Sequence, residues 1–113
     1  MYFSHKEYYT GKISLHVKAV IEDIPANGKS MAMRAAVREF LDDLRYFSVV
    51  DNLHVTVEKD RPLYYTVTAE ADITDLREMW AENEEEAYEL MAEEMREELE
   101  RSLDNMDAVV TEA

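Results

Sequence analysis

The sequence predicts an α+β protein in which two helices cover one face of a single antiparallel sheet, forming a two-layer sandwich. Segments with strictly alternating apolar residues are interleaved along the chain with segments whose apolar residues recur at three- and four-residue steps. The chain has 113 residues and no cysteine. This length predicts one domain, residues 1–113, with a core that needs no disulfide.

The first predicted strand covers residues 13–21. Every second residue from Ile13 to Ile21 is apolar and is expected to face the core, while the residues between them are mostly polar. Pro25 and Gly28 then form a turn. Residues 1–10 form an aromatic N-terminal arm that contains Tyr2, Phe3, Tyr8 and Tyr9, and its role stays open.

A helix is predicted over residues 31–46, with Ser30 as its N-cap. The outer positions carry charges of both signs, as on an ordinary solvated surface. Its apolar residues recur at helical spacing and form the expected buried stripe, which consists of Met33, Ala36, Val37, Phe40, Leu41 and Leu44.

Two further strands are predicted over residues 53–58 and 63–73, both with alternating apolar positions. The link between them has hairpin length and ends at Pro62, which cannot donate a ladder hydrogen bond. The expected inward residues are Leu53, Val55 and Val57 in one strand and Tyr65, Val67, Ala69, Ala71 and Ile73 in the other.

The period becomes helical after Asp75, which predicts an acidic C-terminal helix, or a helix pair broken near Asn83, over residues 75–104. Asp75 with Glu78, and Asn83 with Glu86, each fit a capping box. After this helix the fold either ends or adds a short strand over residues 108–111, and both alternatives stay open. The element order predicts a ferredoxin-like βαββα(β) topology. The expected buried stripe is Leu76, Trp80, Ala87, Met91, Met95, Leu99 and Leu103.

The negative charge is concentrated near the C-terminal end of the sequence. Residues 1–73 contain 11 acidic and 9 basic residues, whereas residues 74–113 contain 15 acidic and 3 basic residues. The net charge is −14, and 10 glutamates stand between residues 82 and 100 against Arg96 alone. A surface of this sign repels nucleic acid and anionic lipid and favours a basic partner.

The spacing of the glutamates lowers the stability expected for this helix. Like charges recur at i,i+4, as in Glu89 and Glu93, and the five such pairs together cost about 1–2.5 kcal/mol. Ten carboxylates along a helix of about 27 Å give one charge per ~2.7 Å. This spacing falls between the ~1.7 Å of duplex DNA and the ~3.4 Å of a single strand.

We therefore predict a small acidic binding protein that presents a carboxylate ridge to a basic, nucleic-acid-binding partner protein. It would mimic nucleic acid and inhibit that partner, as anti-restriction and anti-CRISPR proteins do, without binding nucleic acid directly. The predicted partner-binding residues are Glu82, Glu85, Glu86, Glu89, Glu93, Glu94, Glu97, Glu98 and Glu100. The alternative is a non-catalytic interaction or homodimerising module whose acidity serves only solubility.

No pattern in the sequence predicts catalysis, a cofactor or a metal. With two glycines the chain has no phosphate-binding loop, and its serines lack a nucleophile signature. His16 and His54 would approach each other only if their strands pair, and no His-x-x-His or Glu-x-x-His spacing occurs. We therefore expect a non-enzymatic protein. We also expect it to be cytoplasmic, because it has no cysteine and no apolar run reaches the ~20 residues of a membrane span.

Overall fold

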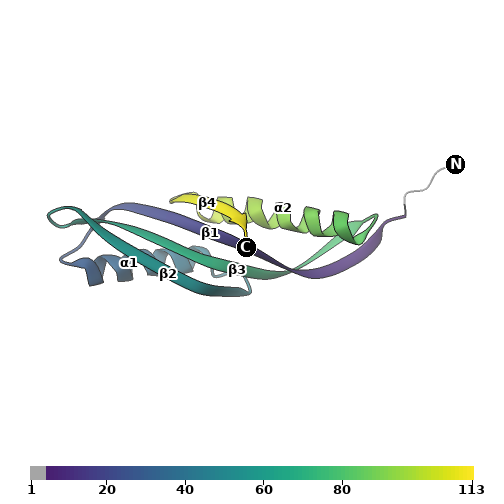
Figure 1. Ribbon diagram of the computed structural model, residues 1–113, viewed down its shortest axis with the longest axis horizontal. Helices are drawn as coiled ribbons and strands as arrows, with labels where there is room; N and C mark the ends of the chain where they lie inside the picture. The colour runs from purple at the N-terminus through teal and green to yellow at the C-terminus, as the bar shows by residue number, and fades with distance from the viewer. Residues whose placement is uncertain (1–4) are drawn as a thin grey trace.

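The structure is a computed structural model that describes residues 5–113 (Figure 1). Tyr2 and Phe3 of the predicted aromatic arm lie outside these residues, whereas Tyr8 and Tyr9 belong to the first strand. The elements in chain order are β1 (Glu7–Pro25), α1 (Lys29–Asp43), β2 (Val49–Arg61), β3 (Tyr64–Ala81), α2 (Glu84–Ser102) and β4 (Asp107–Glu112).

The strands form one antiparallel sheet with the order β2-β3-β1-β4. The predicted ferredoxin-like α+β arrangement is confirmed, with the short final strand as its ending. The two-residue turn between β2 and β3 contains Pro62 and Leu63, and Leu63 has a positive φ of 69°. The hairpin predicted at Pro62 is therefore present.

The two central strands are longer than predicted, and this makes the molecule elongated. β1 has 19 residues and β3 has 18, so at about 3.3 Å per residue each spans roughly 60 Å. The longest dimension of the molecule is 70 Å, and its radius of gyration is 17.7 Å. A compact chain of this length would have a radius of gyration of about 13 Å.

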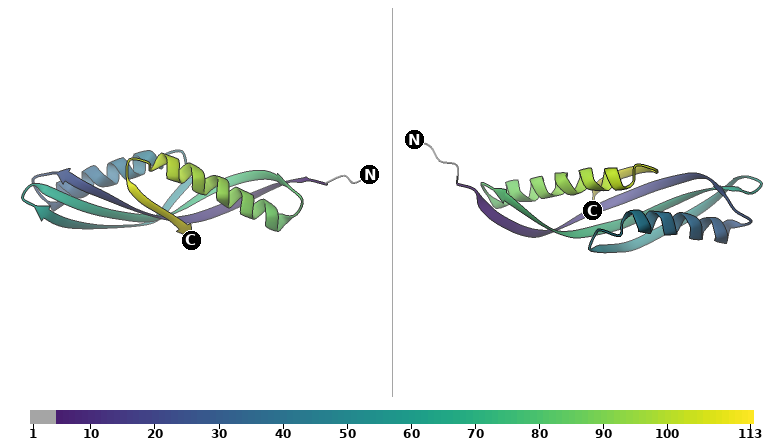
Figure 2. Two further views of the ribbon diagram at one scale, coloured as in Figure 1. Left: turned by 90° about the horizontal axis from the view of Figure 1, so that it is seen from above. Right: turned by 180° about the vertical axis from the view of Figure 1, so that it is seen from behind.

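At one end of the molecule, β1 and β3 are the only strands that continue among the described residues 5–113, and they form a two-stranded ribbon of residues 7–14 and 75–81. β2 pairs with β3 no further than Val49 opposite Thr74, and β4 pairs with β1 no further than Glu112 opposite Leu15. Figure 2 shows α2 running along this end of the sheet and α1 along the other. The two helices therefore cover different ends of the same long sheet.

Both helices pack on the face formed by the odd-numbered residues of β1 and β3. The cores under α2 and α1 both draw on this face, and Phe40 and Leu44 at the end of α1 join the core under α2. Most strand residues predicted to face inward in the two central strands are buried: Ile13, Leu15, Val17 and Ala19 in β1, and Tyr65, Val67, Ala69, Ala71 and Ile73 in β3. Ile21, Val55 and Val57 are only partly buried, and the prediction for Leu53 is wrong, since it is 41% exposed.

The predicted start and buried stripe of the first helix are partly wrong. α1 begins at Lys29 with Gly28 as its N-cap, and no side chain caps it, so Ser30 lies inside the helix. Ala32 and Ala36 face the sheet, because their small side chains let the helix approach Tyr65 and Val67. The larger Met33 and Leu41, which were expected to be buried, are exposed.

The prediction that residue 75 begins a helix is wrong, since residues 75–81 continue β3 along β1. Lys12 lies opposite Leu76, and Tyr8 lies opposite Trp80. Leu76 is 67% exposed and Trp80 is 61% exposed on the face that the helices leave uncovered. One helix, α2, then follows Asn83, and its buried residues Ala87, Met91, Met95 and Leu99 are those predicted.

Candidate functional site on helix α2

The orientation of α2 is set at its first turn and along its apolar side. The side chain of Asn83 accepts a hydrogen bond from the backbone N–H of Glu86 at 2.8 Å, which is the predicted N-cap. Glutamates 84, 85 and 86 follow in the first turn, where the helix dipole favours negative charge. The buried side chains, four residues apart, then turn the opposite side of the helix to solvent.

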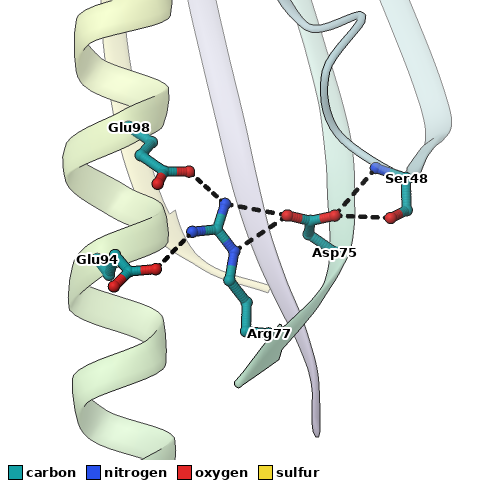
Figure 3. A network of polar contacts seen from close by, with 5 residues as sticks. All are labelled: Ser48, Asp75, Arg77, Glu94 and Glu98. Atoms are coloured by element: carbon teal, nitrogen blue, oxygen red, sulfur yellow. Dashed lines mark hydrogen bonds and ion pairs between the residues drawn. The ribbon is translucent and has the colours of Figure 1, made fainter. Parts of the chain in front are cut away.

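Arg77 of β3 binds two of the predicted site residues. Its side chain is only 9% exposed, and its Nη1 donates to Glu94 Oε1 at 2.9 Å while its Nη2 donates to Glu98 (Figure 3). The carboxylate of Glu98, followed by that of Glu94, raises the pKa of Arg77 against the opposing effect of burial. Glu94 and Glu98 therefore hold α2 on the sheet.

On its other side, the same guanidinium contacts Asp75, which in turn binds the loop before β2. Arg77 Nε and Nη2 each lie 3.0 Å from Asp75 Oδ2. Asp75 Oδ1 in turn accepts the backbone N–H of Ser48 at 3.2 Å and its hydroxyl at 2.6 Å (Figure 3). The network joins β3, α2 and the α1–β2 loop through one partly buried cation.

Glu86 is also engaged within the fold, through its carboxylate and its backbone. Its Oε2 accepts the backbone N–H of Glu82 at 3.2 Å, while its own N–H donates to Asn83. The capping box predicted from Asn83 and Glu86 is thus present in a shifted form, because the glutamate reaches the residue before the N-cap.

Six of the predicted site residues are exposed and make no ion pair or side-chain hydrogen bond within residues 5–113. At 100° per residue they lie on one side of α2 and its N-terminal approach, opposite the buried stripe. We call this set the acidic face, and it consists of Glu82, Glu85, Glu89, Glu93, Glu97 and Glu100.

The acidic face is less dense than the sequence count indicated. Six carboxylates along about 27 Å give one charge per ~4.5 Å, which is nearer to single-stranded than to duplex nucleic acid. Arg96 lies on the same side of the helix and lowers the net charge further. Its guanidinium forms no salt bridge in the part of the chain that the structure describes.

A groove of about 850 Å³ lies between the first half of α2 and the ribbon part of β1. Tyr9 and Gly11 line it from β1, and Ala87, Tyr88 and Met91 line it from α2. Carboxylates stand along the same groove, contributed by Glu84, Glu85, Glu89 and Glu112. The groove therefore combines apolar surface with negative charge beside the acidic face.

The uncovered face of the sheet holds an ion-pair cluster that the sequence did not indicate. His16 Nδ1 lies 2.9 Å from Asp72 Oδ1, and His16 Nε2 lies 3.2 Å from Glu70 Oε2. These bonds, led by that from Asp72, raise the pKa of His16, whereas bonds from Asn52 and then His16 lower the pKa of Asp72. Both ring nitrogens face carboxylates, so the imidazolium form fits this cluster best.

The strands of His16 and His54 do not pair, because β3 lies between them, so the condition for these histidines to approach each other is not met. Among residues 5–113, no group of three or more histidine or acidic side chains is arranged to hold a metal ion. In the same range, no helix combines the length and apolar character needed to cross a bilayer.

An aromatic patch lies further along the uncovered face, at the ribbon. The rings of Tyr8 and Trp80 are 5.1 Å apart between centroids, and Leu76 is exposed on the same face. Sequence reasoning missed this patch because it placed Leu76 and Trp80 on a helix. Arg77, Met79 and Ala81 lie on the opposite face, and because one of the three is charged, they give no clear apolar alternation that would indicate a strand.

No protein-family model matches the chain, and no curated protein matches it. Among solved structures, the crystal structure of protein SO0527 from Shewanella oneidensis aligns with 66% of this chain and 97% of that chain. The TM-score is 0.26 and the sequence identity is 13%, so this match carries no conclusion about fold or function.

Proposed function

We propose that this protein binds a basic, nucleic-acid-binding protein through the acidic face of α2 and competes with nucleic acid for it. The role is one of binding without catalysis, of the kind that anti-restriction and anti-CRISPR inhibitors perform in the cytoplasm. The observation that carries the proposal is that two glutamates of α2 form ion pairs within the fold, whereas those of the acidic face form none. Glu94 and Glu98 bind Arg77, while the glutamates of the acidic face form no salt bridge within residues 5–113, even though Arg96 lies on their side of the helix.

Solubility alone is a weaker explanation of this arrangement. A helix that needs only to be soluble can alternate glutamate with lysine at i,i+4 and gain stability from the pairs. On α2, Glu85, Glu89, Glu93 and Glu97 instead follow one another at four-residue steps. Each such like-charge pair costs a few tenths of a kcal/mol, which a basic partner would offset on binding.

The test is a charge reversal confined to the acidic face, with Glu85, Glu89, Glu93 and Glu97 replaced by lysine. The tagged protein is used to capture proteins from a nuclease-treated lysate of its source organism at low and high salt. We expect nucleic-acid-binding proteins to be captured at low salt and lost at high salt. The reversed variant should capture none of them.

The matched control carries the same charge change elsewhere, with lysine at Glu22, Glu39, Asp42 and Glu58. It should capture the same proteins as the unmodified chain, since it leaves α2 intact. A purified captured protein should then release bound nucleic acid when the unmodified chain is added. Capture that is equal for both variants, or nucleic acid that stays bound, would exclude the proposal.

The aromatic patch favours a second candidate, a homodimer that buries the ribbon's uncovered face. Exposed Tyr8, Leu76 and Trp80 together form the kind of apolar surface that interfaces cover. Sedimentation should then show a dimer that Leu76→Ser with Trp80→Ser converts to a monomer. Tyr46→Ser, at another exposed aromatic residue, should leave the dimer unchanged. A monomer at all concentrations would eliminate this candidate.

A further inference from the structure

The ribbon part of β1 has a strand on only one side. β1 pairs with β3 along its whole length, from Glu7 opposite Ala81 to Pro25 opposite Tyr64. On its other side, β4 pairs only from Leu15 to Val20. Within residues 5–113, the backbone of residues 7–14 therefore has no strand neighbour on the β4 side.

This edge lacks most of the features by which proteins protect an exposed strand. Proline, bulges and inward-pointing charges commonly blunt such edges. Residues 7–14 contain no proline, and the irregularity of β1 lies between Ile21 and Ile24, away from this segment. Lys12 is the one lysine there, and its side chain lies on the uncovered face.

The groove described above runs beside this edge. Tyr9 and Gly11 of the edge form one wall, and Tyr88 and Met91 of α2 form the other. Glu112, the last residue of β4, also lines the groove, so β4 ends where the free edge begins. A strand added here would lie in line with β4 and next to the carboxylates of α2.

We propose that residues 7–14 of β1 accept an extended basic segment of the partner protein as an additional β-strand, antiparallel to β1 as β4 is. Main-chain hydrogen bonds to the free edge would hold it, as in other cases of strand addition. Eight residues span about 26 Å. Lysine or arginine side chains suit the groove, because their aliphatic stems would contact Tyr88 and Met91 while their charged ends reach Glu85 and Glu89.

This inference rests on the proposed function and specifies the form in which the partner binds. The charge of the groove selects the occupant, because Glu84, Glu85, Glu89 and Glu112 line it and the lining contains no lysine or arginine. A second copy of this chain would bring its own glutamates against these, which makes it a poorer occupant. An acidic peptide is excluded on the same ground.

The probe is a fluorescent eight-residue peptide of alternating valine and lysine, bound to the full chain at low salt. Two derivatives carry N-methyl groups on the backbone, one at all valines and the other at all lysines. In an added strand every second N–H faces the edge, so only one derivative loses those hydrogen bonds. We expect that derivative to bind about tenfold or more weakly, and the other to match the unmodified peptide.

Hydrogen exchange of the protein provides the second measurement. Peptide binding should slow exchange at amides within residues 7–14 and leave residues 15–20 unchanged, since these already face β4. Equal affinity of the two methylated peptides, or no binding of the unmodified one, would overturn the proposal. Protection of residues 7–14 that rises with protein concentration alone would assign the edge to a second copy and also overturn it.

The two proposals fail in different ways. If the edge proposal is wrong but the proposed function is right, the methylated peptides bind equally while the lysine variant of the acidic face still loses its captured partner. If the proposed function is wrong, that variant keeps its partner whatever the peptides show.

Discussion

At the scale of single residues, His16 should make stability depend on pH near neutrality. Its pKa is raised above the ordinary 6.5, so the folded state binds the proton more tightly than the unfolded chain. The stabilisation is complete below pH 6.5 and is lost as the pH rises through the folded value. Because the cluster is about one-third exposed, the effect should stay below about 1 kcal/mol.

His16→Gln should therefore flatten the pH dependence of the free energy of unfolding between about pH 6 and pH 8.5, measured with urea. His54→Gln is the control, because His54 forms no ion pair in the described part of the chain. A slope that survives in His16→Gln would show that another group causes it.

At the acid end, the lowered pKa of Asp72 predicts a loss of stability as the pH falls below 3.8.

Asp43 is a residue whose charge opposes folding. Its Oδ2 is buried without a hydrogen-bond partner in the described residues, and burial raises its pKa above 3.8. The folded state thus disfavours the carboxylate, and this cost is present at pH 7. We expect Asp43→Asn to stabilise the protein by about 1 kcal/mol in thermal unfolding. Asp42→Asn, which removes an exposed pair with Arg45, should stabilise nothing.

At the scale of elements, Arg77 fixes α2 to the sheet. Arg77→Ala leaves Asp75, Glu94 and Glu98 near one another without their cation, so we expect the free energy of unfolding to fall by about 2–4 kcal/mol. Arg77→Lys should recover only part, because an ammonium cannot bind three carboxylates in the same geometry. Arg96→Ala, at an arginine without an ion pair in residues 5–113, should change stability by less than about 0.5 kcal/mol.

Alternation in the sequence was sufficient to predict the middle of the central strands but not their ends. Ile13 to Ala19 and Tyr65 to Ile73 alternate cleanly because one face packs under helices. In residues 75–81 the uncovered face carries Leu76 and Trp80, whose four-residue spacing resembles a helical stripe. Local spacing cannot distinguish these cases, since the strand depends on its pairing with β1.

The outline of the candidate site could be predicted from the sequence, but the ion pairs that engage part of it could not. The buried residues of α2 follow from helical periodicity, and they place most glutamates on the outer side. The binding of Glu94 and Glu98 by Arg77 required knowledge of how β3 lies under α2. Helical spacing places these two residues beside the buried stripe, but it does not indicate that a cation of β3 lies opposite them.

At the scale of the whole molecule, the net charge of −14 should make salt act in opposite directions on folding and on binding. Raising ionic strength from about 0.02 M to about 0.5 M screens the repulsion between carboxylates, so the melting temperature should rise by a few degrees. The same change should weaken capture of the basic partner. A melting temperature that falls with added sodium chloride would contradict this account.

The long pairing of β1 with β3 also determines the order in which the chain can fold. The β2–β3 hairpin closes over Pro62 and Leu63, whereas Glu7 must find Ala81 across most of the sequence. Non-local pairing of this kind forms late, because the closure of a long loop precedes its contacts. We therefore expect the ribbon to be the last part to form and the first to open, with amides of residues 7–14 exchanging before those of the four-stranded region.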